Sequence, residues 1–208
     1  MSNESKSLSA GRKLKLQVQM TIDGFVAGPN GELNWLTWNW GDDIKKYVNE
    51  LHDSVDTILL GRKMTDGFIS HWLSVIENKD VSSKELSENY EFAKRMIDIP
   101  KVVFTKTIKK HNWVNTSLAT GDLTEEIKNL KEKSGKDIIV YGGAGFVSSL
   151  IKNNLIDEYN LFINPSAIGK GVEMFSRLDE KINLKLSESV AFDCGIVLNK
   201  YVTNSKGN

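Results

Sequence analysis

The sequence predicts a single-domain α/β fold of three layers, in which a mostly parallel sheet lies between helices and ends in an antiparallel C-terminal hairpin. Short apolar runs alternate along the chain with stretches of helical periodicity, which is typical of a parallel sheet covered on both faces. No internal repeat, low-complexity tract or linker divides the 208 residues. Two alternating segments near the end of the chain, residues 182–188 and 195–202, predict the hairpin.

The composition argues against several classes of protein. Lys+Arg and Asp+Glu both number 27, so the chain lacks the basic excess of a nucleic-acid-binding protein. No apolar run approaches the roughly 20 residues of a membrane span, and the N-terminus lacks the apolar segment of a signal peptide. The single Cys194 fits a reducing, cytoplasmic compartment. We expect a disordered tail at residues 1–11, one domain at residues 12–203 and a short tail at residues 204–208.

The first elements follow from simple patterns. Residues 13–20 alternate strictly between polar and apolar side chains, which predicts a half-buried strand. Three tryptophans follow within six residues and either line an aromatic pocket or cap the core; they are Trp35, Trp38 and Trp40. A helix begins at Asp42, with acidic residues in its first turn and apolar residues at helical spacing up to Val55. We expect His52 on its exposed side.

The middle of the chain alternates in the same way. Residues 56–60 predict the second strand, and residues 68–80 predict an irregular segment that flanks the active site. A helix is expected over residues 82–98, where Ser82 and Glu85 have the spacing of a capping box. Residues 101–105 predict the third strand.

The remaining elements lead up to the hairpin. A short edge strand is expected within residues 113–119 and a helix over residues 123–133, after Asp122. The stretch from Lys136 to Ile151 predicts a strand, a glycine turn and a helix in direct succession, and residues 159–163 predict a further strand.

Residues suited to phosphate binding follow three of these strands. They are Gly61-Arg62-Lys63, Thr105-Lys106 and Gly142-Gly143-Ala144-Gly145. Because ligands of open α/β sheets bind at the carboxyl ends of strands, we expect the three junctions to converge on one anionic ligand. The last junction lacks the G-x-G-x-x-G dinucleotide fingerprint, so a plain tight turn remains an alternative. A hydroxyl followed by a cation, as in Thr105-Lys106, suits the 2′-phosphate of NADPH, although Lys106 also reads as an exposed loop lysine.

Two carboxylates are candidates for the chemistry. Asp23 follows the first strand, and Asp43 opens the next helix beside Trp40, where a carboxylate in an aromatic pocket can bind an amino-pyrimidine edge or help to deliver a proton. N-terminal capping of the helix is the alternative role of Asp43. The chain has no G-x-S-x-G motif and no His or Cys spacing typical of a metal site, so we expect no bound metal.

Five segments in this order resemble the dihydrofolate reductase-like superfamily. They are MTIDGFVAGPNGELNWL, ILLGRKM, VVFTK, IIVYGGAGFVSSLI and Ile168-Gly169-Lys170-Gly171. The resemblance covers about residues 14–202. It is strongest to the branch that contains the reductase domain of the bifunctional riboflavin-biosynthesis deaminase-reductase.

The resemblance implies NADPH as cofactor and a homodimer that binds a small heterocyclic substrate. Carried over by motif, the cofactor would contact Ala27, Gly61, Arg62, Lys63, Met64, Thr105, Lys106, Gly142, Gly143, Ala144, Gly145 and Phe146. Asp43 and Trp40 would bind the substrate, and Asp43 or Asp23 would be catalytic. Asp43 is the nearest match to the family's acid, and the adjacent Asp42 is the alternative. The peptide between Gly142 and Gly143 would be cis, as in dihydrofolate reductases.

The sequence also departs from the resemblance. It contains no H-x-E with P-C-x-x-C of a fused deaminase, and Trp38-Asn39-Trp40-Gly41 replaces the Trp and Leu-Pro loop that precedes the acid in dihydrofolate reductases. Two hypotheses follow. The first is an NADPH-dependent reductase of a pterin-like or ribosylaminopyrimidine-like compound, and the second is a non-catalytic nucleotide-binding module whose substrate pocket is degenerate.

Overall fold

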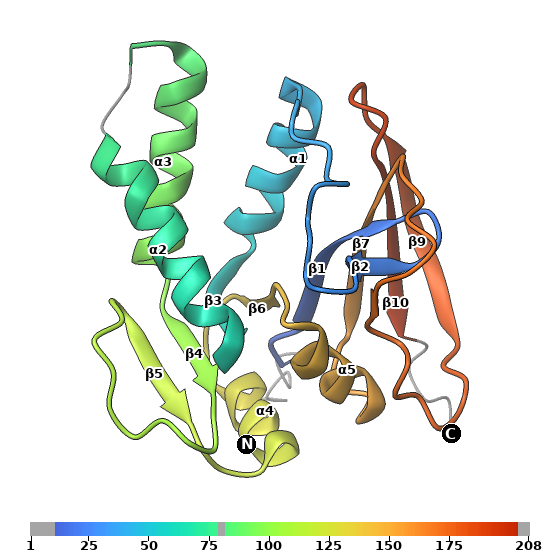
Figure 1. Ribbon diagram of the computed structural model, residues 1–208. Helices are drawn as coiled ribbons and strands as arrows, with labels where there is room; N and C mark the ends of the chain where they lie inside the picture. Colours follow the sequence, from blue (N-terminus) through green and yellow to red (C-terminus); the bar gives the residue numbers. More distant parts are fainter. Residues whose placement is uncertain (1–10, 79–81, 204–208) are drawn as a thin grey trace, which may run out of the picture.

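The computed structural model describes residues 11–78 and 82–203 (Figure 1). The expected tails, residues 1–11 and 204–208, therefore lie outside the described residues except for Gly11. Ten strands and five helices are found within these two ranges. The strands are β1 (Leu14–Thr21), β2 (Phe25–Ala27), β3 (Val55–Gly61), β4 (Lys101–Phe104), β5 (Thr116–Ala119), β6 (Asp137–Val140), β7 (Glu158–Asn164), β8 (Val172–Glu173), β9 (Leu184–Ala191) and β10 (Val197–Thr203). The helices are α1 (Asp42–Asp53), α2 (Arg62–Asn78), α3 (Lys84–Asp98), α4 (Leu123–Glu132) and α5 (Ala144–Lys152).

Eight strands form one mixed sheet in the order β5-β4-β3-β6-β1-β7-β10-β9. The five pairs from β5 to β7 are parallel, and β10 pairs antiparallel with both β7 and β9. The predicted α/β class, the mostly parallel sheet and the antiparallel C-terminal hairpin are confirmed. The expected edge strand within residues 113–119 is β5.

The helices cover both faces of this sheet. Strands β3 and β6 are apolar on both sides at Ile58 to Leu60 and Ile138 to Val140. The expectation that β1 is half-buried was wrong, because this strand lies in the middle of the sheet and also buries the polar Lys15 and Gln17. On one face, α4 and α5 pack on β1, β6 and β7 through a core that includes Leu16, Val140 and Leu150. On the other face, α2, α3 and the end of α1 pack on β3 and β6 around Ile58 and Ile139. The start of α1 instead packs on β7 and the β9–β10 hairpin through a third core.

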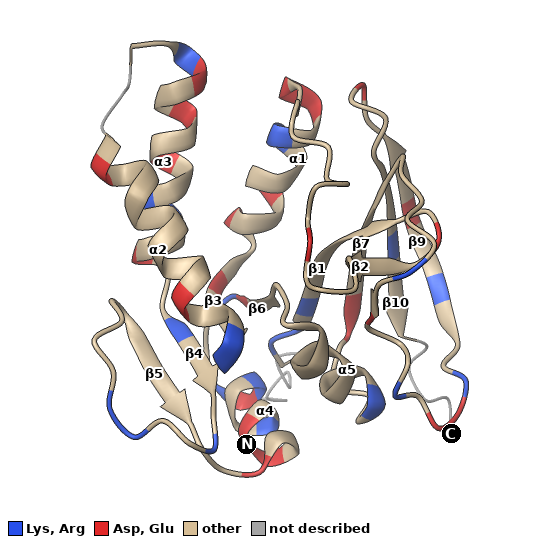
Figure 2. Ribbon diagram, in the orientation of Figure 1, with Lys and Arg blue, Asp and Glu red and all other residues tan. Residues whose placement is uncertain are grey.

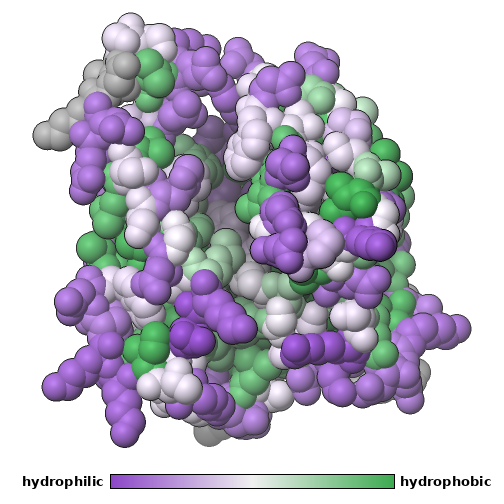
Figure 3. All heavy atoms as spheres, viewed as in Figure 1, coloured by the Kyte–Doolittle hydropathy of each residue, from purple (hydrophilic) through white to green (hydrophobic). Residues whose placement is uncertain are grey.

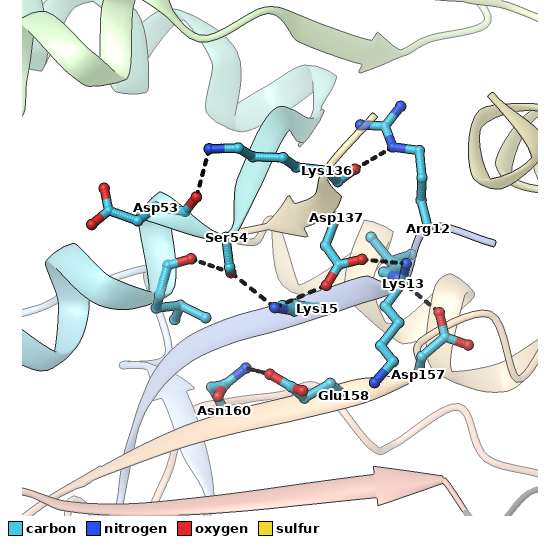
Figure 4. Close-up of polar contacts among 12 residues, drawn as sticks. Arg12, Lys13, Lys15, Asp53, Ser54, Lys136, Asp137, Asp157, Glu158 and Asn160 are labelled. Carbon is cyan, nitrogen blue, oxygen red and sulfur yellow. Dashed lines mark hydrogen bonds and ion pairs between the residues drawn. The ribbon is translucent and has the colours of Figure 1, made fainter. Parts of the chain in front are cut away.

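Aspartates secure the edge of the sheet at which the parallel strands begin (Figure 4). The carboxylate of Asp137 accepts a hydrogen bond from the backbone N–H of Lys13 at 2.8 Å, and Asp157 accepts one from the N–H of Leu14 at 2.7 Å. Lys15 on β1 forms an ion pair with Asp137 at 3.0 Å. These contacts fix the position of β1, which lies in the middle of the sheet between β6 and β7.

Two local expectations were wrong. The predicted irregular segment at residues 68–80 is helical as far as Asn78, because Phe68, Ile69, Trp72 and Leu73 recur at helical spacing and pack on the core; residues 79–80 lie outside the described residues. Helix α3 is capped by Ser83, whose hydroxyl accepts from the N–H of Leu86 at 3.2 Å, rather than by the predicted Ser82. Within the described ranges, no helix is long and apolar enough to cross a membrane.

Candidate functional site

The three junctions predicted to bind phosphate lie side by side, as the sequence predicts. They follow β4, β3 and β6, which are neighbours in the sheet and run parallel. The register pairs Gly61 with Phe104 and Leu59 with Val140, so the three strands end at nearly the same level. The carboxyl edge of the sheet therefore brings Arg62, Thr105 and Gly142 to one region.

Direct contacts tie these junctions together. A Cβ on Gly61 would lie 2.8 Å from the Cβ of Phe146, so only glycine leaves room for the start of α5 at this point. The ring of Phe146 lies 5.0 Å from the ring of Phe104, centroid to centroid. A Cβ on Gly142 would lie 3.5 Å from the Sδ of Met64. Helix α5 thus begins in contact with the ends of both β3 and β4.

The glycine turn has a backbone that suits close approach of a ligand. Gly142 has a φ of 153° and Gly143 a φ of 72°, conformations that side-chain-bearing residues rarely adopt. Gly143 is the N-cap of α5 and provides no side-chain cap for its free N–H groups. The peptide between Gly142 and Gly143 is trans, so the cis peptide expected from the resemblance was wrong.

Arg62 and Lys63 form the first turn of α2, not a loop after β3. Both side chains are exposed, and neither forms a hydrogen bond or ion pair with any residue in the described ranges. Helices α1, α3 and α4 each carry acids in the first turn, whereas α2 and α5 carry none. Cations at the positive, N-terminal end of a helix are unfavourable unless a bound anion offsets their charge. The first turn of α2 therefore has the charge pattern of an anion site (Figure 2).

Thr105 and Lys106 are already engaged in local contacts. The buried Thr105 hydroxyl accepts from the N–H groups of Thr107 and Ile108 at 3.2 and 3.1 Å. The exposed Lys106 ammonium donates to the backbone carbonyls of Thr120, at 3.0 Å, and Gly121. Lys106 therefore links the ends of β4 and β5, and these carbonyls use two of its three N–H donors.

Asp23 fixes a neighbouring loop. Its carboxylate accepts from the backbone N–H groups of Ile168, at 3.0 Å, and Gly169, at 2.7 Å. Hydrogen bonds from the Thr21 side chain and from Gly169 hold the pKa of Asp23 below its usual range. The same loop continues into β8, where Val172 pairs with Ala27. Asp23 thus lies beside the segment that contains Ala27, and one of its carboxylate oxygens accepts both backbone N–H groups.

Asp43 lies some distance along the sheet edge from the glycine turn. Its carboxylate accepts from its neighbour Ile44, at 2.7 Å, and from the N–H of Asp193 in the β9–β10 turn, at 2.8 Å. The hydrogen bond from Asp193 lowers the pKa of Asp43. Asp43 therefore lies beside the turn that precedes β10, and β10 is separated from β6 by β1 and β7 in the sheet.

The three tryptophans have three different environments. Trp35 is buried, and Trp38 is 70% exposed. Trp40 donates through Nε1 to the carbonyl of Thr37 at 2.9 Å and packs against the core beneath α1. They do not form a common aromatic pocket, and Trp40 lies with Phe162, Phe192 and Leu198 rather than beside the glycine turn.

His52 and Tyr141 form a pair that the sequence analysis missed. The expectation that His52 is on the surface was wrong, since it is 2% exposed. Its Nε2 is hydrogen-bonded to the hydroxyl of Tyr141, the residue directly before Gly142, and its Nδ1 lies 2.5 Å from the carbonyl of Val48. The polar neighbours of His52 in the sequence indicated an exposed side of α1. That side of α1 instead faces α3 as well as the sheet, which buries the His52 ring.

The surface is hollowed between α1 and α3 (Figure 3). This cavity measures about 460 Å³ and is lined by residues that include Asn49, Glu91, Phe92 and Arg95. A second hollow of about 680 Å³ lies beside α4, at the opposite edge of the sheet. Neither includes a residue of the glycine turn. Among the described residues, no three His, Cys, Asp or Glu side chains are grouped as metal ligands.

Comparison with known proteins gives consistent matches over nearly the whole chain. Residues 12–198 match the family model described as the RibD C-terminal domain. The uncharacterized protein YyaP of Bacillus subtilis is 32% identical over 187 residues, which cover 89% of this chain and 92% of YyaP.

Solved structures match the fold at low sequence identity. A putative riboflavin biosynthesis protein from Shewanella sp. PV-4 superposes with a TM-score of 0.69 at 20% identity, over 93% of this chain and 99% of that one. Dihydrofolate reductase from Enterococcus faecalis superposes with a TM-score of 0.55 at 15% identity, over 93% and 97% of the two chains. These two matches establish a dihydrofolate reductase-like fold.

Proposed function

The chain belongs to the RibD C-terminal domain family, and on that basis we propose that it is an NADPH-dependent reductase of a small heterocyclic compound. The observation that carries the proposal is the convergence of the β3, β4 and β6 junctions, with two unpaired cations at the start of α2. A dinucleotide offers both the anionic phosphates and the flat rings that such an edge accommodates.

The residues present fit such a cofactor. The unpaired Arg62 and Lys63 would bind phosphate oxygens together with the free N–H groups at the start of α2, and Gly142 to Gly145 would bring the backbone of α5 against the cofactor without Cβ atoms in the way. Lys106 would provide a further cation beside Arg62. Bound nicotinamide would supply hydride to the substrate.

The chain's own residues would orient the bound cofactor. Phe146 and Phe104 pack under the junction and hold the glycine turn against β3, which fixes the height of the turn above the sheet. The loop that Asp23 holds keeps Ala27 and Val172 paired beside β1, so it borders the same edge. Both contacts place backbone rather than side chains next to the ligand.

The substrate is proposed to be pterin-like or ribosylaminopyrimidine-like, as in dihydrofolate reductases or the riboflavin-pathway reductases that this family resembles. Hydrogen-bonding groups on a ring edge need acceptors, and Asp43 remains the candidate acid at the start of α1. Each carboxylate oxygen of Asp43 already accepts one backbone N–H, from Ile44 and from Asp193, and would accept the substrate's donors in addition.

A second candidate function has one specific observation in its favour. Asp43 is hydrogen-bonded to the β9–β10 turn and Trp40 packs against the core under α1, so both side chains already have structural roles. A nucleotide-binding module without turnover would have such an arrangement. It predicts binding of NADPH but no oxidation of NADPH with any pterin or aminopyrimidine.

Thermal unfolding with NADPH, with NADH and without ligand tests the proposal. A ligand at about 100 times its Kd adds roughly 2.7 kcal/mol to the free energy of unfolding, which gives a measurable rise in Tm. We expect a larger rise with NADPH than with NADH. No rise with either nucleotide would contradict the cofactor assignment, and steady NADPH oxidation that depends on Asp43 would rule out the second candidate.

A further inference from the structure

The hydrogen bond between His52 and Tyr141 joins two elements that are distant in sequence. His52 belongs to the last turn of α1, and Tyr141 is the residue between β6 and the glycine turn. The two rings are stacked, with centroids 5.8 Å apart and planes 16° from parallel. Nδ1 of His52 faces the carbonyl of Val48, so it carries the proton, and Nε2 accepts from the Tyr141 hydroxyl.

Aromatic and apolar side chains enclose this pair on the remaining sides. Phe92 of α3 lies edge-on to His52 at 5.0 Å, and Phe68 of α2 lies 5.6 Å from the ring of Tyr141. The Tyr141 hydroxyl is also 3.7 Å from the Sδ of Met96. Helices α1, α2 and α3 therefore all contact the one side chain that directly precedes Gly142.

The chain has little other means of fixing this point. β6 ends at Val140, and the next two glycines have no side chain that could pack or hydrogen-bond. Glycine gives the backbone more conformational freedom than any other residue. The orientation of Gly142 and Gly143 must therefore be set from their two ends: by Phe146 against Gly61 on one side and by Tyr141 on the other.

We infer that the His52–Tyr141 hydrogen bond is a positioning element of the nucleotide site, which holds the end of β6 so that the glycine turn presents its backbone to the ligand. Neither residue touches the ligand in this role. The inference rests on the proposed function for its effect on NADPH, but its effect on the turn itself does not depend on a nucleotide.

The charged groups around His52 do not compete for its ring nitrogens. Asp53 of α1 and Arg95 of α3 are the charged residues nearest to it, and they form an ion pair with each other at 2.6 Å. From α2 the pair is contacted by the uncharged ring of Phe68. A neutral His52 therefore remains the acceptor for Tyr141 at neutral pH.

Tyr141→Phe tests the inference, because it keeps the ring and its packing and removes only the hydroxyl. The control is Tyr47→Phe, which removes another tyrosine hydrogen bond of α1, to Glu188 at 2.9 Å, far from the glycine turn. Two quantities are measured on each folded variant: hydrogen exchange of the peptide that spans residues 141–147 without ligand, and the Kd for NADPH at a temperature well below the Tm.

We expect exchange in residues 141–147 to be about tenfold faster in Tyr141→Phe than in the wild type, and the Kd for NADPH to rise about tenfold. Tyr47→Phe should leave both unchanged. His52→Gln, which retains an acceptor, should lie closer to the wild type than His52→Leu. The double variant with His52→Leu and Tyr141→Phe should show no larger increase in exchange or in Kd than the more affected single variant, since both substitutions remove the same hydrogen bond.

The outcomes separate the inference from the proposed function. Unchanged exchange and unchanged Kd in Tyr141→Phe would overturn the inference, as would equal effects of Tyr47→Phe. If the wild type does not bind NADPH yet exchange at residues 141–147 still responds to Tyr141→Phe, the proposed function fails and the positioning role stands.

Discussion

Gly61 at the end of β3 and Phe146 in the first turn of α5 are in such close contact that a Cβ on residue 61 would lie 2.8 Å from the Cβ of Phe146. This contact sets the distance between the third strand and the helix that follows the glycine turn. It explains why glycine is needed at residue 61 even though its backbone has an ordinary strand conformation.

Gly61→Ala should destabilise the protein by about 1–3 kcal/mol, because the new methyl group must push α5 away from β3. Urea unfolding measures this change. Gly67→Ala is the matched control: Gly67 lies inside α2, where a Cβ would meet nothing within 4 Å. It should stabilise the protein by about 0.5–1 kcal/mol through helix propensity. Equal effects of the two changes would contradict the role of the contact.

Arg62→Ala should raise the Tm of the ligand-free protein slightly, because it removes an unpaired cation from the positive end of α2. It should weaken NADPH binding, as measured by titration calorimetry, about tenfold or more, and NADH binding less. Lys128→Ala, which removes an exposed lysine beside the hollow at α4, should change neither the affinity for NADPH nor the affinity for NADH. A loss of affinity that is the same for both nucleotides would argue against an interaction of Arg62 with the 2′-phosphate.

His52 should make the stability depend on pH between about 4 and 6.5. Burial lowers the pKa of His52 to about 4, whereas in the unfolded chain it is near 6.5. Between these values only the unfolded state binds the proton, so stability is full above pH 6.5 and falls as the pH drops.

From pH 7.5 to 5.5 the loss from this one group is about 1 to 1.5 kcal/mol, measured by urea unfolding at each pH. His52→Gln should remove that part of the loss, whereas His71→Gln, on the exposed side of α2, should retain it. A His52→Gln protein with the pH dependence of the wild type would show that other groups are responsible.

Asp23→Asn and Asp23→Ala should differ strongly. Both N–H donors, from Ile168 and Gly169, go to one carboxylate oxygen, and an asparagine oxygen can still accept them. Limited proteolysis within residues 166–171 should therefore be near normal in Asp23→Asn and fast in Asp23→Ala. If Asp23 is instead catalytic, as one of the sequence-based alternatives holds, Asp23→Asn should abolish turnover while the loop remains protected.

The fold was predictable because its signals are local and mutually consistent. The alternation of Leu14, Leu16 and Val18 and the apolar run at Ile138 to Val140 describe strands without knowledge of their partners. The convergence of Arg62, Thr105 and Gly142 followed from a rule about parallel sheets alone. The strand register that brings the three junctions to the same level depends on which residues pair between strands, and the sequence does not show that pairing.

The rest depends on contacts between distant segments. Nothing near His52 in the sequence indicates Tyr141, and its polar neighbours Asn49 and Asp53 suggested an exposed face. Asp43 has the sequence context of a ligand-binding acid, but the turn that it holds comes 150 residues later in the chain. The helical part of residues 68–80 was not predicted, partly because Gly67 interrupts the apolar positions that define α2.

The central position of β1 has a consequence for how the chain folds during synthesis. β1 is made first, yet its neighbours β6 and β7 begin at Asp137 and Glu158, and Asp137 and Asp157 bind its first residues. At roughly 5–20 residues per second, the nascent chain spends on the order of ten seconds or more with this strand unpaired on both sides. We expect chaperone dependence in the cell to be greatest over that interval and to end only when β7 leaves the ribosome.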